Sequence, residues 1–180
     1  IQLLSNDAHE RHVYTHTGWR KLGEHWAFLH AGGAIGANGS LRGVEVHLPG
    51  DLRNYMLPEP PEGADLVQAI RVSLRVLELA DDGITVPINA GAYRAVLGAI
   101  DVTIHLSGAT GEGKTALAAL AQQHFEPGMD ARHLPGSWSS TGNALEGLAF
   151  SAKDVLLVVD DFAPTGSAPA VQRMRRGADR

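Results

Sequence analysis

Apolar positions along this chain follow three spacings, and each spacing predicts a different kind of element. Between residues 13 and 48, apolar and aromatic residues alternate with polar ones over short runs, as in strands with one buried face. From Asp65 to Ala80, apolar residues recur every three or four positions, which predicts an amphipathic helix. Two later runs, Val102–Ser107 and Val155–Val159, are apolar throughout and rich in branched residues, which is typical of strands buried on both faces.

Residues 1–60 are predicted to form a small antiparallel β module. Asn38 and Gly39 lie between two of its runs, and both accept the positive φ that a tight hairpin turn requires, so the turn is expected over 37–40. Trp19 and Trp26 are expected in the core of the module, because large aromatic rings bury much apolar area. The strands are expected over 13–21, 25–30 and 44–48.

Residues 61–100 are predicted to hold a linker and helices. The proline-rich stretch over 58–63 is expected to be stiff. Asp65 is the expected N-cap of the helix over 65–80, and Gly83 its stop signal. A second helix, apolar nearly all round, is expected over 90–100 and buried beneath a sheet.

Residues 101–180 contain the motif that carries most chemistry. Gly108–Thr115 reads Gly-Ala-Thr-Gly-Glu-Gly-Lys-Thr and matches the phosphate-binding pattern G-x-x-x-x-G-K-[ST]. It lies between the expected strand 102–107 and a run of helix formers over 116–125, which is the context that the motif requires. Backbone N–H groups and the positive helix end then face a polyphosphate. The predicted cofactor-binding residues are Gly108, Ala109, Thr110, Gly111, Glu112, Gly113, Lys114 and Thr115.

Individual side chains of this motif have separate expected roles. Lys114 is expected to reach the β- and γ-phosphates of a nucleotide, and the Thr115 hydroxyl to bind Mg²⁺. Downstream, the run 155–159 ends in Asp160 and Asp161, and a carboxylate at that strand end is the expected second Mg²⁺ ligand, which makes Asp160 the candidate. Asp161 is the candidate base that orients water. The alternative is that both aspartates simply end the strand.

The polar segment 134–146 lies between the two predicted parts of the site. Its hydroxyl and amide side chains precede a helix expected over 144–153, whose start would lie on the nucleotide side of the sheet. The alternative needs no ligand, since Thr141 or Asn143 could be the N-cap of that helix.

Composition sets further bounds. The chain has 180 residues, of which 44% are hydrophobic and 19% charged, so it is globular. It has no cysteine, which excludes disulfides and thiolate zinc sites and fits a cytoplasmic protein. No apolar run approaches the ~20 residues of a membrane span. With a net charge of −5, nucleic acid would need a local patch. Arg173, Arg175, Arg176 and Arg180 offer one, or form a solvated tail.

The fold class predicted from these elements is α/β, a P-loop core with a parallel sheet. Such a sheet normally has about five strands. Only three candidates follow the linker, at 102–107, 132–134 and 155–160. We therefore expect the sequence to be part of a longer protein whose core continues after Arg180.

Three stretches, 105–125, 134–146 and 153–164, resemble a bacterial family of P-loop ATPases known as a domain of unknown function. This family occurs with primases and helicases of phages, plasmids and integrative elements, and the stretch around Thr17–Trp19 is similar to its N-terminal part. The resemblance implies Gly108–Thr115 as Walker A and Asp160 as Walker B. It also implies Asp-Glu where this chain has two aspartates.

These observations together predict a Mg²⁺-dependent ATPase in which Lys114 and Asp161 are catalytic. Because the family occurs with primases and helicases, the resemblance implies that this chain is the motor part of a helicase- or primase-associated protein of a mobile element. ATP with Mg²⁺ is the expected ligand, DNA is expected to bind through regions outside this chain, and a homo-oligomer is expected. A nucleotide-switched regulatory or assembly module with slow hydrolysis is the alternative, and a small-molecule kinase a third.

Overall fold

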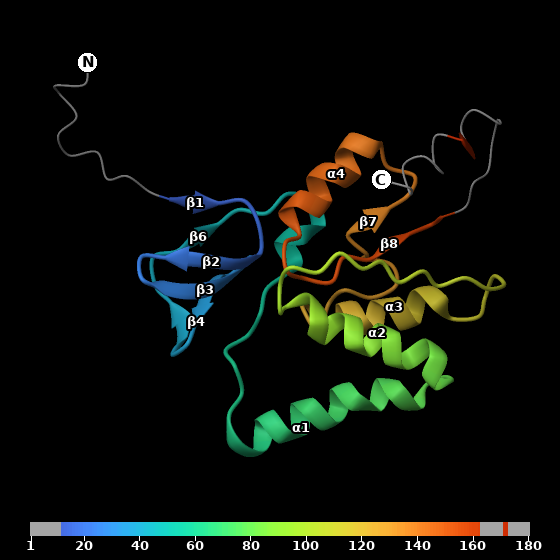
Figure 1. Cartoon of the computed structure of the whole chain (residues 1–180), viewed down its shortest axis with the longest axis horizontal. Coiled ribbons are helices and arrows are strands. Elements are labelled where there is room, and N and C mark those ends of the chain that lie inside the picture. Colours follow the sequence, from blue (N-terminus) through green and yellow to red (C-terminus); the bar gives the residue numbers. More distant parts are fainter. Residues whose placement is uncertain (1–11, 163–170, 173–180) are drawn as a thin grey trace.

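The structure, a computed structural model, describes residues 12–162 and 171–172. It is mixed α/β: an N-terminal β module lies beside a part built from helices and a short parallel sheet (Figure 1). The elements in order are β1 (Val13–Tyr14), β2 (Gly18–Leu22), β3 (His25–His30), β4 (Gly33–Gly36), β5 (Gly39–Leu41), β6 (Glu45–Val46), η2 (Gly50–Asn54), α1 (Gly63–Leu74), η3 (Arg75–Glu78), α2 (Asp82–Ala95), α3 (Lys114–Gln122), β7 (Gly136–Ser137), α4 (Gly142–Ser151) and β8 (Val159–Asp160).

The β module contains an antiparallel sheet, as its alternating pattern predicts, but the strand predicted over 13–21 is divided into β1 and β2, and the one predicted over 44–48 is reduced to β6. Strands β2 to β5 form one antiparallel sheet in chain order, while β6 pairs in parallel with β1. The predicted hairpin is confirmed, but its turn lies one residue earlier, because Gly36 pairs with Gly39. Gly39 has the expected positive φ, +93°, but Asn38 does not have a positive φ. One hydrophobic core cluster of the β module contains Ala27, Leu29, Ala34 and Val46.

The prediction that the two tryptophans lie in the core is wrong. Trp19 is 38% exposed and Trp26 is 60% exposed. The Trp19 ring packs edge-on against Phe28, with 5.3 Å between ring centroids, and its indole Nε1 donates to the carbonyl of Val96 at 2.6 Å. An indole can thus cover apolar area with one face and satisfy its N–H without burial.

A set of hydrogen bonds attaches the β module to the chain that follows α4. The Thr17 hydroxyl donates to the carbonyl of Lys153 at 2.7 Å, and the Thr17 N–H donates to Ser151 O at 2.9 Å. The backbone N–H of Trp19 donates to Asp154 Oδ2 at 2.9 Å, and Lys153 Nζ donates to Trp19 O at 3.0 Å. The start of β2 is therefore joined to the segment that leads into β8.

Helix boundaries in the middle of the chain differ from the predicted ones. The helix predicted over 65–80 is divided into α1 and the 3₁₀ turn η3, and Glu62 holds the N-cap position expected for Asp65. Helix α2 starts eight residues before the predicted helix 90–100 and ends at Ala95, so that Leu97 is 74% exposed rather than buried. Gly83 lies in the first turn of α2 and does not stop a helix.

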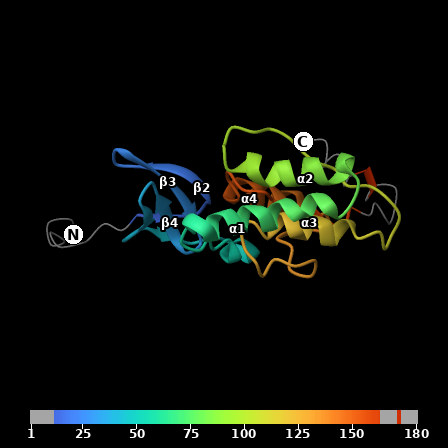
Figure 2. The same cartoon turned by 90° about the horizontal axis from the view of Figure 1, so that it is seen from below.

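Polar side chains join α1 to the two neighbouring helices, α2 and α3, along which it runs in Figure 2. Ser73 Oγ lies 2.6 Å from His124 Nε2, and the Tyr93 hydroxyl donates to Ser73 Oγ at 2.7 Å. His124 Nδ1 lies 2.9 Å from the carbonyl of Ala121 in α3. No residue of α1 is buried, so these bonds contribute much of its attachment.

The parallel sheet is shorter than the sequence predicts. Strands β7 and β8 pair in parallel, with Gly136 opposite Val159. The strand predicted over 132–134 is wrong, because a turn occupies 131–133 and the strand begins at Gly136. The strand predicted over 102–107 is not formed, and in the predicted strand 155–160 only the last two residues pair. The apolar pattern identifies chain that can be buried, but a strand also needs a neighbour for its backbone groups.

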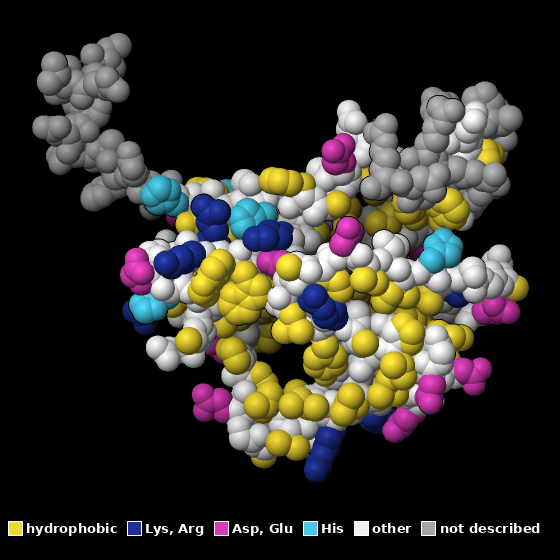
Figure 3. All heavy atoms as spheres, viewed as in Figure 1, with side chains coloured by type: hydrophobic (Ala, Val, Ile, Leu, Met, Phe, Trp, Pro, Cys, Tyr) yellow, Lys and Arg dark blue, Asp and Glu magenta, His cyan; other side chains and the backbone are white. Residues whose placement is uncertain are grey.

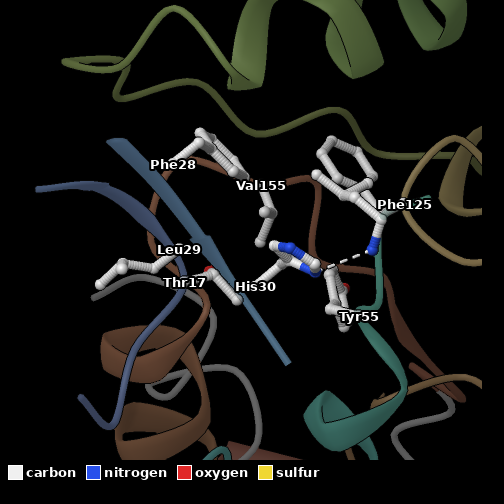
Figure 4. Close-up of a pocket in the computed structure, with 8 residues that line it drawn as sticks. Thr17, Phe28, Leu29, His30, Tyr55, Phe125 and Val155 are labelled. Carbon is white, nitrogen blue, oxygen red and sulfur yellow. Dashed lines mark hydrogen bonds between the residues drawn. The ribbon is translucent and has the colours of Figure 1, made fainter. Parts of the chain in front are cut away.

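The β module and the helical part meet around the buried residue His30 (Figure 4). Its Nδ1 accepts hydrogen bonds from the N–H of Leu57 at 3.0 Å and of Gly32 at 3.3 Å. Tyr55 and Phe125 line the same spot, where the remaining space is too small for a water molecule. This place is packed core and offers no room for a ligand.

We expect His30 to make the fold less stable in acid. Burial lowers the pKa of its imidazole below the ordinary 6.5, although the Glu59 carboxylate opposes this shift. A proton on Nδ1 would also displace both backbone donors. The unfolded chain therefore binds the proton more readily, so the contribution of His30 is complete above about pH 6.5 and is lost as pH falls below that value.

The His30→Asn variant tests this, because an amide oxygen can accept the same N–H groups without titrating. Chemical unfolding is measured between pH 7.5 and pH 5. The unfolding free energy of the native chain should fall more steeply with decreasing pH than that of the variant. Parallel curves would show that His30 does not contribute to the acid response.

Candidate functional site

The loop over 108–113 has the backbone shape that its glycines were expected to permit. Gly111 and Gly113 have φ of +90° and +78°, in the left-handed region, and α3 begins at the next residue, Lys114. A Cβ atom at either glycine would meet nothing within 4 Å. These positions therefore require glycine for their backbone angles and not for space. The loop 108–113 is exposed throughout.

The Lys114 side chain folds back over this loop. Its Nζ donates to the carbonyl of Gly108 at 3.0 Å and to that of Ala109 at 2.5 Å. The first turn of α3 contains no acidic residue, so its positive end is not neutralised from within the helix. Thr115 follows on that turn and is half-buried. The Glu112 carboxylate lies over Gly108, where a bound anion would have to displace it.

The carboxyl end of β8 lies toward the same end of the molecule as this loop (Figure 1). Asp160 is half-buried at that strand end, and its carbonyl accepts from the N–H of Trp138 at 2.9 Å. Asp161 is exposed and has φ +62°, a left-handed backbone that aspartate tolerates better than most residues. The two neighbouring carboxylates therefore have different surroundings.

An aromatic cluster joins the segments on either side of the site. The Phe162 ring, two residues after Asp160, lies 5.9 Å from the ring of His105 and 5.2 Å from that of Trp138, centroid to centroid. His105 is three residues before Gly108. The chain entering the loop and the chain leaving β8 are thus in contact.

Helix capping explains one polar residue of the segment before α4. The Thr141 side chain accepts from the N–H of Ala144 at 3.3 Å, which makes Thr141 the N-cap, while Asn143 lies inside the helix. The hydroxyls of Ser137, the last residue of β7, and of Ser139 lie 2.8 Å apart. Capping accounts for Thr141, and the serines remain available at the carboxyl edge of the sheet.

Gln122, a fully buried side chain at the end of α3, is not singled out by any pattern in the sequence. Its Nε2 donates to the carbonyl of Leu156 at 2.7 Å and to the Tyr55 hydroxyl, and its Oε1 accepts from the N–H of Val158 at 2.9 Å. Tyr55 in turn donates to Leu156 O at 2.8 Å. Burial raises the pKa of the Tyr55 hydroxyl, so it remains a donor. Only its hydrogen bonds to the backbone of Leu156 and Val158 distinguish Gln122 from an ordinary helical glutamine.

One hollow in the surface lies away from the loop. An open groove of about 510 Å³ runs between α2 and the segment 99–104, and no residue of the motif lines it. Exposed apolar side chains are spread over the face of the molecule that Figure 3 shows. Val102, which lines the groove, is 70% exposed. This groove is therefore not the phosphate site.

The remaining predictions concern metal ligands, membrane helices and the arginine patch. The described residues contain no group of three or more His, Cys, Asp and Glu side chains that could hold a metal ion. Across residues 12–162, no helix is both long and apolar enough to cross a membrane. The arginine patch at 173–180 lies outside the described residues.

Comparison with known proteins gives one match. Residues 90–168 match the model of a family described as Domain of unknown function (DUF927). No curated protein and no solved structure matches the chain. The matched part extends from the end of α2 beyond β8 and includes every predicted site residue, but the family's description specifies no activity.

Proposed function

We propose that this chain binds ATP with Mg²⁺ at Gly108–Thr115 and is a P-loop ATPase. The observation that supports this best is the loop itself. Glycines with left-handed backbones lead into a helix at Lys114, and the ammonium lies over the loop carbonyls. This leaves exposed N–H groups and a helix N-terminus for anionic oxygens, and that is the chemistry of phosphate binding.

The residues present fit such a ligand. Lys114 can exchange two backbone carbonyls for phosphate oxygens, which form stronger charge-assisted bonds. The Thr115 hydroxyl and the Asp160 carboxylate are hard oxygen ligands of the type that Mg²⁺ prefers. When bound, the metal ion offsets charge on the phosphates. Lys114 adds to that neutralisation, and Asp161 orients water for in-line attack.

The wider role that we propose is the motor part of a helicase- or primase-associated protein of a mobile element, acting as a homo-oligomer in the cytoplasm. It rests on the resemblance described above. DNA would bind through regions outside this chain.

One observation favours a nucleotide-switched module with slow hydrolysis instead. Asp161 is one methylene shorter than glutamate and is exposed on a left-handed backbone, so its reach toward water is shorter. Turnover of ATP by the full-length protein, which includes the expected DNA-binding regions, is measured with and without DNA and separates the two proposals, because a motor should be stimulated by DNA and a switch should not.

The two aspartates should respond differently to substitution. Asp160→Asn should weaken Mg²⁺-dependent nucleotide binding, since an amide is a poorer Mg²⁺ ligand than a carboxylate. Asp161→Asn should leave binding unchanged and slow hydrolysis by roughly 10²–10⁴-fold, the usual contribution of a general base. Nucleotide titration and phosphate release are measured on both variants.

Asparagine also tolerates the left-handed backbone at position 161, so this variant tests charge and not strain. Equal losses of nucleotide affinity in both variants would contradict the proposed division of roles.

A further inference from the structure

Gln122 takes the place of a strand residue beside the segment that leads into β8. The Leu156 carbonyl and the Val158 N–H are the pair that one residue of a neighbouring parallel strand would bind. The Gln122 amide binds both. Along the same edge, Gly136 N–H donates to Val158 O at 3.2 Å and Trp138 N–H donates to Asp160 O at 2.9 Å. The side chain therefore continues the edge that β7 occupies.

Gln122 also has a fixed relation to the phosphate loop. It follows Thr115 by seven residues, nearly two full turns, so both side chains project from the same face of α3, about 10 Å apart along its axis. Gln122 binds the backbone on either side of Leu157, and Asp160 lies three residues, or about 10 Å, farther along the strand direction. Because α3 and β8 run in opposite directions in Figure 1, moving back along α3 from Gln122 to Thr115 and forward along the strand from Leu157 to Asp160 are displacements in the same direction. Thr115 and Asp160 are therefore expected at the same height along the helix axis.

We propose that Gln122 is a positioning residue that sets the register of Asp160 against Thr115, the two protein ligands expected for Mg²⁺. This inference rests on the proposed function. The Gln122 amide is hydrogen-bonded to the backbone on both sides of Leu157. Helix α3 and this segment therefore cannot shift along one another without breaking a hydrogen bond to the buried Gln122 side chain. Tyr55 reinforces the arrangement, because its hydroxyl binds both Gln122 and Leu156.

The experiment uses the Gln122→Met variant, which keeps length and volume but removes both hydrogen-bonding groups. A fluorescent ATP analogue is titrated in EDTA and then at increasing Mg²⁺. The apparent Mg²⁺ affinity should fall roughly tenfold, as for groups that orient a metal ligand. Affinity for the analogue in EDTA should stay within about twofold of the native value, because the loop donors are unchanged.

Leu52→Ala is the matched control, since Leu52 is fully buried in the core that contains Tyr55 but has no side-chain hydrogen bond to the strand. It should leave the Mg²⁺ dependence unchanged. If Gln122→Met does not fold, Gln122→Glu replaces it, because its carboxylate still accepts from Val158 but no longer donates to Leu156.

Each remaining result decides against the inference. Native Mg²⁺ dependence in a folded Gln122 variant would overturn it while leaving the proposed function intact. Equal losses in the Leu52 and Gln122 variants would reduce Gln122 to a stability role. No nucleotide binding by the native chain would instead overturn the proposed function, and this inference with it.

Discussion

Replacing Lys114 by alanine should weaken ATP binding by about 10- to 150-fold, the effect of losing one charge-assisted hydrogen-bonded contact of about 1.5–3 kcal/mol. The loop is otherwise held by backbone, so the phosphates lose their nearest cation while most N–H donors stay in place. The Nζ bonds to Gly108 and Ala109 lie on an exposed loop, so the fold should persist. Titration with a fluorescent ATP analogue in Mg²⁺ measures the loss.

Lys21→Ala is the control, because it removes the same charge from an exposed ion pair with Glu24 in the β module. It should bind the analogue like the native chain. Thermal unfolding of both variants establishes that they are folded. ATP affinity that survives in a folded Lys114→Ala chain would refute the assignment of the phosphate loop.

Replacing Gly18 by alanine should destabilise the fold by about 2–5 kcal/mol. Gly18 has φ +90°, which costs a residue with a Cβ atom about 1–2 kcal/mol. The added Cβ would also lie 2.5 Å from Lys153 O and 2.6 Å from Asp154 Oδ2, and such overpacking costs about 1–3 kcal/mol. Denaturant unfolding followed by circular dichroism measures the change.

Gly23→Ala separates the two causes. Gly23 lies at the other end of β2 with φ +60°, and a Cβ atom there would meet nothing within 4 Å. It should show only the backbone cost. If both variants lose the same stability, the close contact between the β module and the chain after α4 has no energetic weight.

Local sequence patterns were sufficient to predict an element where interactions between residues close in the sequence decide its structure. The helix expected over 116–125 is present as α3, moved toward the loop because its first turn includes Lys114. Helix α4 begins after Thr141, one of its two candidate caps. The hairpin of the β module also formed, since alternation and a short polar turn specify it within a few residues. Gly83 misled because glycine costs little in a first turn, where N–H groups have no partner within the helix.

Features that depend on distant partners could not be read from the sequence. The runs 102–107 and 155–158 are apolar enough for strands, but pairing requires a neighbour that the local pattern does not name. Gln122 is an unremarkable helical residue until the backbone of Leu156 and Val158 is placed beside it. Trp19 was expected inside because its size suggests burial, yet the carbonyl of Val96 holds it at the surface.

The unpaired segment before the glycine loop 108–113 has a consequence for how the chain behaves in solution. Val102 and Ile104 are 70% and 39% exposed, and no backbone group of residues 102–106 is hydrogen-bonded to another residue that the structure describes. Extended apolar chain of this kind is a template for further extended chain, so it promotes self-association as concentration rises. Asp101 directly precedes this run in the sequence, and a charge at such a position is expected to oppose the association. Colloidal stability of this chain therefore depends on a few residues immediately before its most conspicuous motif.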